Sequence, residues 1–318
     1  MSTAKTWDER IGRRLKLRDL HIFMTVAQRR SMGKAATDLA VSQPAVSKAI
    51  ADLEHTIGAR LLDRTTLGVE PTLYGEALLK WGGVVFDDLR QGVEELEFLA
   101  NPTAGEIRIS TTEPMAAGLV PAVVDRVSRQ YPRLVINVLQ AATVPLQYAA
   151  LRERKVDLIL GRMVTPIPDE DLNLEILFMD PFRVVTGANN RWARRRKVAL
   201  VDLAEEAWTL PQRDGWIGPA VVEALHASGL NTLPHVVFSN SIQLHNALMA
   251  TGRFFTVLSA STVRFSGKRL ALKILPIDLP IAAGAVGIVT LKNRTLSPVT
   301  KLFIECAREV ASTLATSK

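Results

Sequence analysis

Residues 31–65 read SMGKAATDLAVSQPAVSKAIADLEHTIGARLLDRT and decide the fold of the first part of the chain. Ser31 and Ser42 each precede a helical pattern, and a serine hydroxyl can accept from the free N–H groups of a first helical turn. Pro44 falls in the first turn of the second helix, where a missing N–H costs little. Gly58 is expected to end that helix. Its apolar side chains recur at steps of three or four residues, as Val46, Ile50, Leu53 and Ile57.

Two helices joined by three or four residues are typical of a helix-turn-helix, whose second helix enters a DNA major groove about 12 Å wide. The leading residues of such a helix must be small or flexible donors and acceptors. An ordinary three-helix segment explains the same pattern equally well. A preceding helix is indicated by Leu17, Leu20, Phe23, Met24 and Ala27. The outward face of the later helix offers Gln43, Ser47, Lys48 and Ala51.

The following stretch, RLLDRTTLGVEPTLYG, holds two short extended runs around a glycine. This pattern predicts a β-hairpin wing packed beside the helices, with Arg60 and Arg64 near its base. Arg64 is expected to contact a DNA phosphate. A salt bridge from Arg64 to Asp63 or Glu54 is the alternative interpretation.

The charge of the chain is unevenly distributed. Residues 1–66 carry 12 basic and 7 acidic side chains, residues 67–100 carry 2 and 7, and residues 101–318 carry 25 and 18. The net charges of these segments are therefore +5, −5 and +7. A basic first segment is compatible with nucleic acid, although an ordinary solvated surface explains it as well.

The acidic segment predicts one long helix, which Thr72 caps and which runs to about Ala100. A single apolar stripe on a long polar helix requires a partner. Packing against its own chain is the alternative, although the preceding helical head is small. Gly82, Gly83 and Gly92 weaken the helix but would permit close approach of a partner helix. The stripe consists of Leu78, Trp81, Val85, Leu89, Val93, Leu96 and Ala100.

From Glu106 onward, strand and helix patterns alternate, which predicts mainly parallel sheets covered by helices. Ligands of such sheets lie beyond the carboxyl ends of the strands, at helix N-termini. Each hydroxyl at these positions has helix capping as its alternative role. The candidate ligand-binding residues are Ser110, Thr111, Thr112, Thr143, Gly161, Arg162, Trp216, Ile217, Ser239 and Asn240.

The motif within residues 35–64 resembles that of LysR-type transcriptional regulators. Here it reads AATDLAVSQPAVSKAIADLE, followed by GARLLDR. Thr72 and Gly75 match the family's T-x-x-G at the start of the linker helix, and Met32 replaces the usual aromatic residue. The resemblance implies a multidomain α+β protein with an N-terminal winged helix-turn-helix, a long linker helix and a C-terminal two-lobed α/β effector domain like that of periplasmic binding proteins.

The resemblance implies boundaries for each part. The winged helix-turn-helix should span residues 16–72, the linker helix residues 73–101 and the effector domain residues 105–318. Lobe I should comprise about 105–177 and 281–318, and lobe II about 178–280. The residues expected at the DNA are Ser31, Ser42, Gln43, Pro44, Ser47, Lys48, Arg60 and Arg64.

The implied partners are double-stranded DNA, a second copy of the chain through the linker helix, and a small-molecule effector between the lobes. A homotetramer and a contact with RNA polymerase are further expectations. Arg162 and the helix N-termini favour an organic acid, although Glu113 opposes one unless it pairs or faces solvent. About 15 residues precede the family's usual start, and their basic side chains contact DNA or form a solvated tail.

Other function classes find little support. Cys306 is the only cysteine, so an intramolecular disulfide framework is excluded, and no H-x-x-x-H pair suggests a metal site. Nucleotide-loop and nucleophile-elbow motifs are missing, and nothing near Glu113 supplies a nucleophile, so we expect neither an enzyme nor a cofactor. No signal or membrane segment is apparent, which predicts a cytoplasmic protein. The alternative function is a cytoplasmic small-molecule binding protein with a two-lobed domain.

Overall fold

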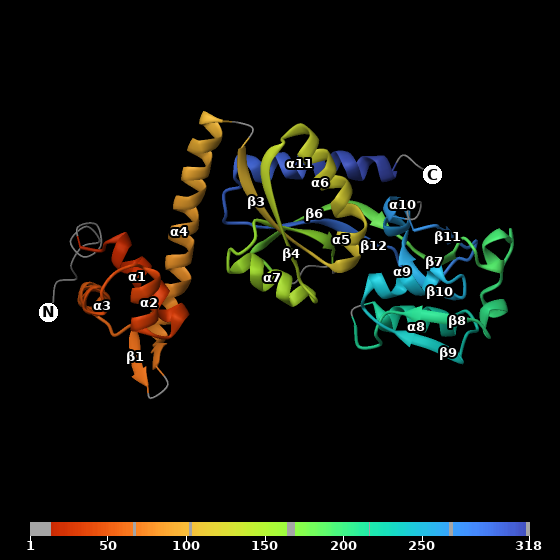
Figure 1. Ribbon diagram of the computed structural model, residues 1–318, viewed down its shortest axis with the longest axis horizontal. Helices are drawn as coiled ribbons and strands as arrows, with labels where there is room; N and C mark the ends of the chain where they lie inside the picture. Colours follow the sequence, from red (N-terminus) through yellow and green to blue (C-terminus); the bar gives the residue numbers. More distant parts are fainter. Residues whose placement is uncertain are drawn as a thin grey trace. The chain divides into compact units, whose positions relative to one another are not determined.

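The computed structural model describes residues 14–65, 68–101, 104–163, 169–215, 217–266 and 270–315. The chain divides into two compact units, residues 1–90 and residues 91–318. The boundary falls within one long helix. Figure 1 labels the elements of both units.

The first unit is a three-helix head with a two-stranded wing. Buried side chains of all three helices and both wing strands form its core, among them Phe23, Val46 and Leu61. The elements are α1 (Leu17–Arg29), α2 (Met32–Asp38), α3 (Gln43–Ile57), β1 (Leu62–Thr65) and β2 (Gly68–Pro71).

The predicted caps of the head helices are present. Ser31 Oγ accepts from Lys34 N at 3.3 Å, and Ser42 Oγ accepts from Ala45 N at 3.4 Å. Gly58 ends α3 with φ of 80°, a left-handed conformation that favours glycine. These residues fix the length of each helix and the turn between α2 and α3.

Glu54 of α3 joins the wing to the head. Glu54 Oε1 accepts from the backbone N–H groups of Leu61, at 2.8 Å, and Leu62, at 3.2 Å. β1 and β2 pair antiparallel, with Thr65 opposite Gly68. The Glu54 carboxylate therefore holds the backbone at the start of the wing. The alternative prediction, a salt bridge between Glu54 and Arg64, involves the Arg64 side chain, which lies outside the described part of the chain.

The long helix α4 (Leu73–Ala100) begins against the head. Thr72 Oγ1 accepts from Gly75 N at 3.1 Å, which is the predicted cap. A Cβ on Gly75 would lie 2.1 Å from the carbonyl oxygen of Leu61, so only glycine fits there. Gly82 faces Met24 of α1, where a Cβ would lie 3.0 Å from Sδ, and it therefore serves packing within the chain rather than a partner helix.

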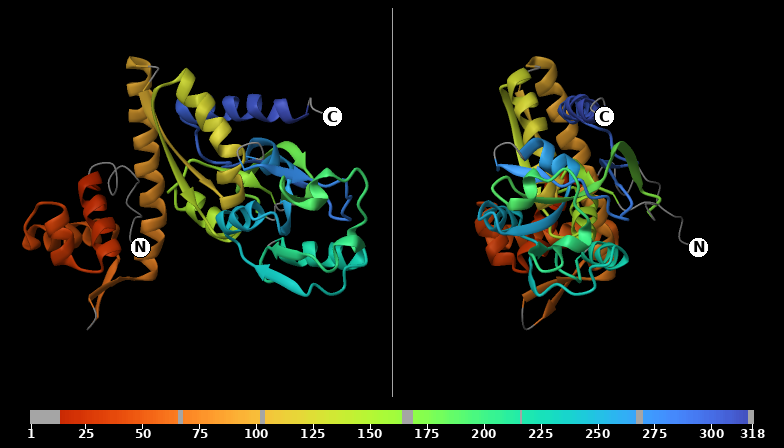
Figure 2. Two further views of the ribbon diagram at one scale, coloured as in Figure 1. Left: turned by 45° about the vertical axis from the view of Figure 1, so that its right-hand side comes forward. Right: turned by 90° about the vertical axis from the view of Figure 1, so that its right-hand side faces the viewer.

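Lobe I of the second unit is a five-stranded sheet in the order β4-β3-β5-β12-β6. Helices α6 and α11 lie side by side on one face of the sheet, whereas α7 packs on the other (Figures 1 and 2). The strands are β3 (Ala104–Thr111), β4 (Arg133–Gln140), β5 (Leu158–Arg162), β6 (Leu172–Asp180) and β12 (Gly284–Leu291). The helices are α5 (Glu113–Ala117), α6 (Leu119–Gln130), α7 (Val144–Arg152) and α11 (Pro298–Ala315).

Lobe II is a second five-stranded sheet in the order β11-β7-β10-β8-β9, with a core around Trp208 and Phe255. Its strands are β7 (Phe182–Gly187), β8 (Ala207–Leu210), β9 (His235–Phe238), β10 (Phe254–Ser259) and β11 (Leu272–Ile274). Its helices are the 3₁₀ turns η2 (Arg191–Arg194) and η3 (Leu200–Leu203), with α8 (Gly218–Ala227), α9 (Ile242–Ala250) and α10 (Ala260–Ser266).

The predicted sheets differ from the observed ones in their strand directions. In lobe I, β12 runs antiparallel to β5 and β6, and in lobe II, β7 runs antiparallel to β10 and β11. Strand β6 and helix α10 were not expected from the sequence. The chain crosses between the lobes twice, after β6 and before β12, and each crossing adds an antiparallel strand to a parallel sheet.

Candidate functional site

The first two turns of α3 carry an exposed polar surface. Ser42, Gln43, Pro44 and Lys48 are exposed there. Ser47 is half-buried, and its hydroxyl lies 3.4 Å from Met32 Sδ on α2. The predicted DNA-binding residues of α3 therefore share one surface, with Ser47 partly committed to packing between α2 and α3.

The other predicted DNA-binding residues lie around this turn or beyond it. Ser31 is half-buried and caps α2, so its hydroxyl is engaged in the fold. Arg60 is exposed before the wing, and its carbonyl oxygen accepts from Thr72 Oγ1 at 2.7 Å. The position of the Arg64 side chain lies outside the described residues.

The two lobes are joined by a carboxylate at a helix N-terminus. Glu113 Oε1, at the start of α5 in lobe I, accepts from the backbone N–H of Ile242 at 3.0 Å. Ile242 begins α9 of lobe II, and Ser241 caps the same helix by accepting from Leu244 N at 3.3 Å. The positive end of α9 therefore already receives a negative charge from the opposite lobe.

A buried ion pair lies where the chain crosses from lobe I to lobe II. Arg162 Nη2 donates to Asp180 Oδ2 at 2.9 Å, and the side chains are 8% and 1% exposed. Ser261 of α10 donates to the same carboxylate through its hydroxyl, at 2.6 Å, and its backbone N–H, at 3.0 Å. Burial lowers the pKa of the Arg162 guanidinium, and the charge of Asp180 opposes that change.

The predicted contact between Arg162 and an organic acid stays a prediction, and the structure shows how the guanidinium is held. Its guanidinium also lies over the Phe182 ring, 4.4 Å from the centroid, and a Cβ on Gly284 would meet its Nη1 at 2.1 Å. Arg162 therefore contacts the chain at both crossings between the lobes, at Asp180 and Phe182 in the first and at Gly284 in the second. Its guanidinium is buried and paired with Asp180 at the crossing between the lobes.

The remaining predicted effector residues fall into three groups. Ser110, Thr111 and Gly161 are buried within the lobe I sheet, where Thr111 Oγ1 donates to the carbonyl of Leu160 at 2.7 Å. Trp216 lies outside the described residues. The others lie at or near the surface: Thr112, Ile217 and Ser239 are half-buried, and Thr143 and Asn240 are exposed.

Among the buried polar atoms of lobe I that have no hydrogen-bond partner within the described part of the chain, two lie at or near the predicted effector residues. They are Ser110 Oγ of β3 and Gln147 Nε2 of α7. A Cβ on Gly161 would lie 3.9 Å from Gln147 Nε2, which places Gln147 against the end of β5. Sequence reasoning missed Gln147, because its position on the buried face of α7 depends on how that helix packs.

His245 of α9 is a second residue that sequence reasoning did not assign to the site. Its Nε2 lies 2.8 Å from the carbonyl oxygen of Ser239, and its Nδ1 lies 3.2 Å from Thr256 Oγ1. Burial lowers the pKa of His245. The histidine fixes the loop between β9 and α9, and no spacing in the sequence indicates that role.

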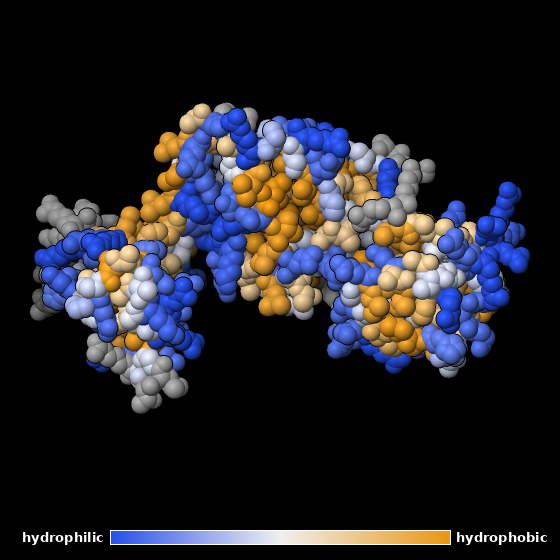
Figure 3. Space-filling model, in the orientation of Figure 1, coloured by the Kyte–Doolittle hydropathy of each residue, from blue (hydrophilic) through white to orange (hydrophobic). Residues whose placement is uncertain are grey.

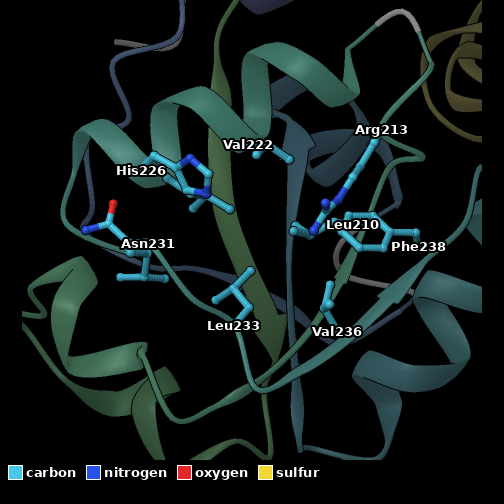
Figure 4. Close-up of a pocket in the computed structure, with 10 residues that line it drawn as sticks. Leu210, Arg213, Val222, His226, Asn231, Leu233, Val236 and Phe238 are labelled. Carbon is cyan, nitrogen blue, oxygen red and sulfur yellow. The ribbon is translucent and has the colours of Figure 1, made fainter.

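A cavity of about 60 Å³ lies within lobe II, between α8 and strands β8 and β9 (Figure 4). Its lining is largely apolar, and Arg213 lies over the Phe238 ring, 4.7 Å from the centroid. Of the predicted effector-binding residues that the structure describes, none lines this cavity. It is therefore separate from the contact between the lobes.

The described residues contain no cluster of three or more histidine, cysteine or acidic side chains arranged to hold a metal ion. The single cysteine, Cys306, is buried in α11. None of the helices described by the structure is both long enough and apolar enough to cross a membrane.

Comparison with known proteins defines the class. Residues 17–76 match the bacterial regulatory helix-turn-helix protein of the lysR family, and residues 100–312 match the LysR substrate binding domain. The HTH-type transcriptional regulator PcaQ of Agrobacterium fabrum is 27% identical over 304 residues, which cover 96% of this chain and 97% of PcaQ.

Solved structures show the same fold. A full-length OxyR point variant from Pseudomonas aeruginosa has a TM-score of 0.61 and 19% identity, and the match covers 93% of this chain and 94% of OxyR. Full-length CbnR complexed with its target DNA has a TM-score of 0.61 and 18% identity, covering 93% of this chain and all of CbnR, at 100%.

A winged helix-turn-helix joined by a long helix to a two-lobed α/β domain defines a ligand-responsive class of transcriptional regulator. The chain belongs to the LysR family of bacterial regulatory helix-turn-helix proteins. The resemblance and the fold class predicted from the sequence are thereby confirmed.

Proposed function

We propose that this LysR-type regulator binds operator DNA through α3 and responds to an organic acid held between its lobes. The observation that carries the DNA part is the exposed N-terminal part of α3, where Gln43 in the first turn and Lys48 in the second are exposed. A glutamine amide pairs with an adenine edge, and a lysine ammonium contacts phosphate. The CbnR complex with its target DNA supports the same use of the head.

The experiment that tests DNA binding is selection of fragments from genomic DNA by the purified full chain, followed by sequencing. A regulator retains a small set of fragments that share a sequence. Uniform retention of all fragments, or none, contradicts the proposal. The same outcome separates a regulator from an enzyme or a simple binding protein, neither of which selects DNA.

We propose a homodimer through α4, with tetramers formed by further contacts between effector domains. The stripe residues Trp81, Leu89 and Leu96 of α4 are 63%, 46% and 68% exposed. Figure 3 shows apolar side chains along this helix. Exposed apolar surface of this extent is typical of an interface, and a two-fold partner would place two heads on two half-sites.

We infer that the effector binds at the α9 N-terminus, in competition with Glu113. The support is the hydrogen bond that Ile242 N donates to Glu113 Oε1. A helix N-terminus that binds one carboxylate can bind another in its place. Binding would release Glu113 and so change the contact between the lobes. A ligand shifts such an equilibrium only through unequal affinity for the two states.

A thermal-shift screen of organic acids and their neutral amides tests the effector proposal. The acids should raise the melting temperature and the amides should not. Glu113→Gln should bind the same acids several-fold more tightly, because a competing negative charge is removed. Stabilisation by amides alone, or equal acid affinity in both proteins, would contradict the proposal.

The proposed role in transcription also implies how and where the protein works. The chain acts as a regulator rather than as an enzyme, needs no resident cofactor, and works in the cytoplasm, where its DNA target lies. RNA polymerase is the partner through which it would alter transcription.

A further inference from the structure

Lobe II carries a dense run of basic side chains that the proposed function does not use. Residues 191–197 read RWARRRK, and all five basic residues in this run are exposed. The run occupies η2 and the chain that follows it, between β7 and β8. Figure 3 shows hydrophilic side chains at the right-hand edge of the molecule, where Figure 1 draws this green segment.

The run is held on the surface by buried residues at both ends. Asn190 caps η2 by accepting from Trp192 N at 2.8 Å, and Trp192 Nε1 donates to Glu206 at 2.8 Å. Ala193 within the run and Val198 after it are buried. The basic side chains therefore project from an anchored segment, and their position does not depend on a free tail.

Most of these charges have no counter-charge within the described part of the protein. Arg191 pairs with Glu206, but Arg194, Arg195, Arg196 and Lys197 make no ion pair or side-chain hydrogen bond there. Nearby Asp202 is occupied in accepting from Ala199 N at 3.0 Å. Four neighbouring cations repel one another, so the cluster does not stabilise the fold, and a densely anionic partner would relieve that repulsion.

We propose that residues 191–197 bind the DNA phosphate backbone as a second, sequence-independent contact. Double-stranded DNA carries one charge per about 1.7 Å of its axis, a density that suits adjacent cations. Three of the four unpaired cations are arginines, and each planar guanidinium group can donate two hydrogen bonds to one phosphate. The inference rests on the proposed DNA binding by α3, which brings DNA to the same molecule and raises its effective concentration at lobe II.

The test uses the full chain and a random-sequence duplex of about four helical turns, roughly 40 base pairs. Affinity is measured by fluorescence anisotropy over a series of salt concentrations. In the patch variant, Arg194, Arg195, Arg196 and Lys197 are all replaced by glutamine. The control variant replaces four other exposed basic residues by glutamine, namely Arg133, Lys273, Lys292 and Lys301.

The patch variant should bind more weakly, and its plot of log affinity against log salt should be flatter by about one unit for each phosphate that the protein no longer neutralises. The control variant should keep the wild-type slope. An unchanged slope in the patch variant overturns the proposal. A loss of transcription with that unchanged slope would also overturn it, since it assigns the patch to an acidic protein surface. Failure of the wild type to bind any DNA would instead refute the proposed function itself.

Discussion

At the scale of single residues, Asp180 connects the two lobes. It is 1% exposed and accepts from Arg162 of lobe I and from Ser261 of lobe II. It also ends β6, directly before the chain enters lobe II. Removal of one partner of a buried pair leaves an uncompensated charge, which costs far more than the loss of an exposed pair.

Asp180→Ala should therefore lower the free energy of unfolding by about 3–5 kcal/mol, because the Arg162 charge would be left buried without a partner. Denaturant titration followed by circular dichroism measures the change. Glu309→Ala, which breaks the exposed Arg126–Glu309 pair, is the control and should cost about 1 kcal/mol or less. Equal effects of the two substitutions would show that Asp180 does not hold the crossing.

His245 makes the stability of the second unit depend on pH. Burial depresses its pKa below the ordinary value of 6.5, so the unfolded chain takes up a proton at a pH where the folded chain does not. The stabilisation is fully present above about pH 6.5 and is lost as the pH falls through the folded pKa.

Melting temperatures of wild type and His245→Gln, measured between about pH 5 and pH 7.5, test this dependence. The wild type should lose more stability than the variant as the pH falls, so the difference between the two should shrink. Parallel curves over this range would mean that the protonation of His245 does not control stability.

At the scale of elements, α4 has two faces with different roles. One face packs against the head, where Gly75 and Gly82 allow the backbone to approach Leu61 and Met24 closely. The other face carries exposed apolar side chains along the length of the helix. Exposed apolar surface of this extent is typical of an interface, which is the basis of the proposed dimer.

Val85→Glu combined with Leu89→Glu should dissociate the dimer, because each charge would be buried in the proposed interface. Light scattering at several protein concentrations measures the assembly. Lys80→Glu, an exposed change on α4 with the same shift of −2 in charge, should leave the assembly intact. An unchanged mass for the double variant would contradict a dimer through α4.

At the scale of the whole molecule, local signals predicted the head far better than the site between the lobes. Ser31, Ser42, Thr72 and Gly58 act on backbone groups within a few residues, so the sequence alone indicates their roles. The order of the helices and of most strands likewise follows from the spacing of apolar residues along the chain. The winged head could therefore be predicted from local signals, whereas the two-lobed domain was implied by the resemblance to LysR-type regulators.

The residues between the lobes could not be predicted in this way. Arg162 pairs with Asp180, 18 positions later, and Asp180 binds Ser261, 81 positions further on. These contacts depend on two chain crossings and on antiparallel strands that no local pattern indicates. In the sequence, Arg162 consequently resembled an unpaired cationic residue that could bind an anion, whereas in the folded chain it pairs with Asp180 at the crossing between the lobes.

The central claim is that α3 reads DNA sequence through its N-terminal part. The most direct test is a fluorescence anisotropy titration of Gln43→Ala and Lys48→Ala on a fragment selected by the wild type. Gln43→Ala should weaken specific binding by about 1–3 kcal/mol and relax the preference at one base pair. Lys48→Ala should weaken binding to all sequences and flatten the salt slope by about one unit. Unchanged specific affinity in Gln43→Ala would contradict the assignment of α3 as the recognition helix.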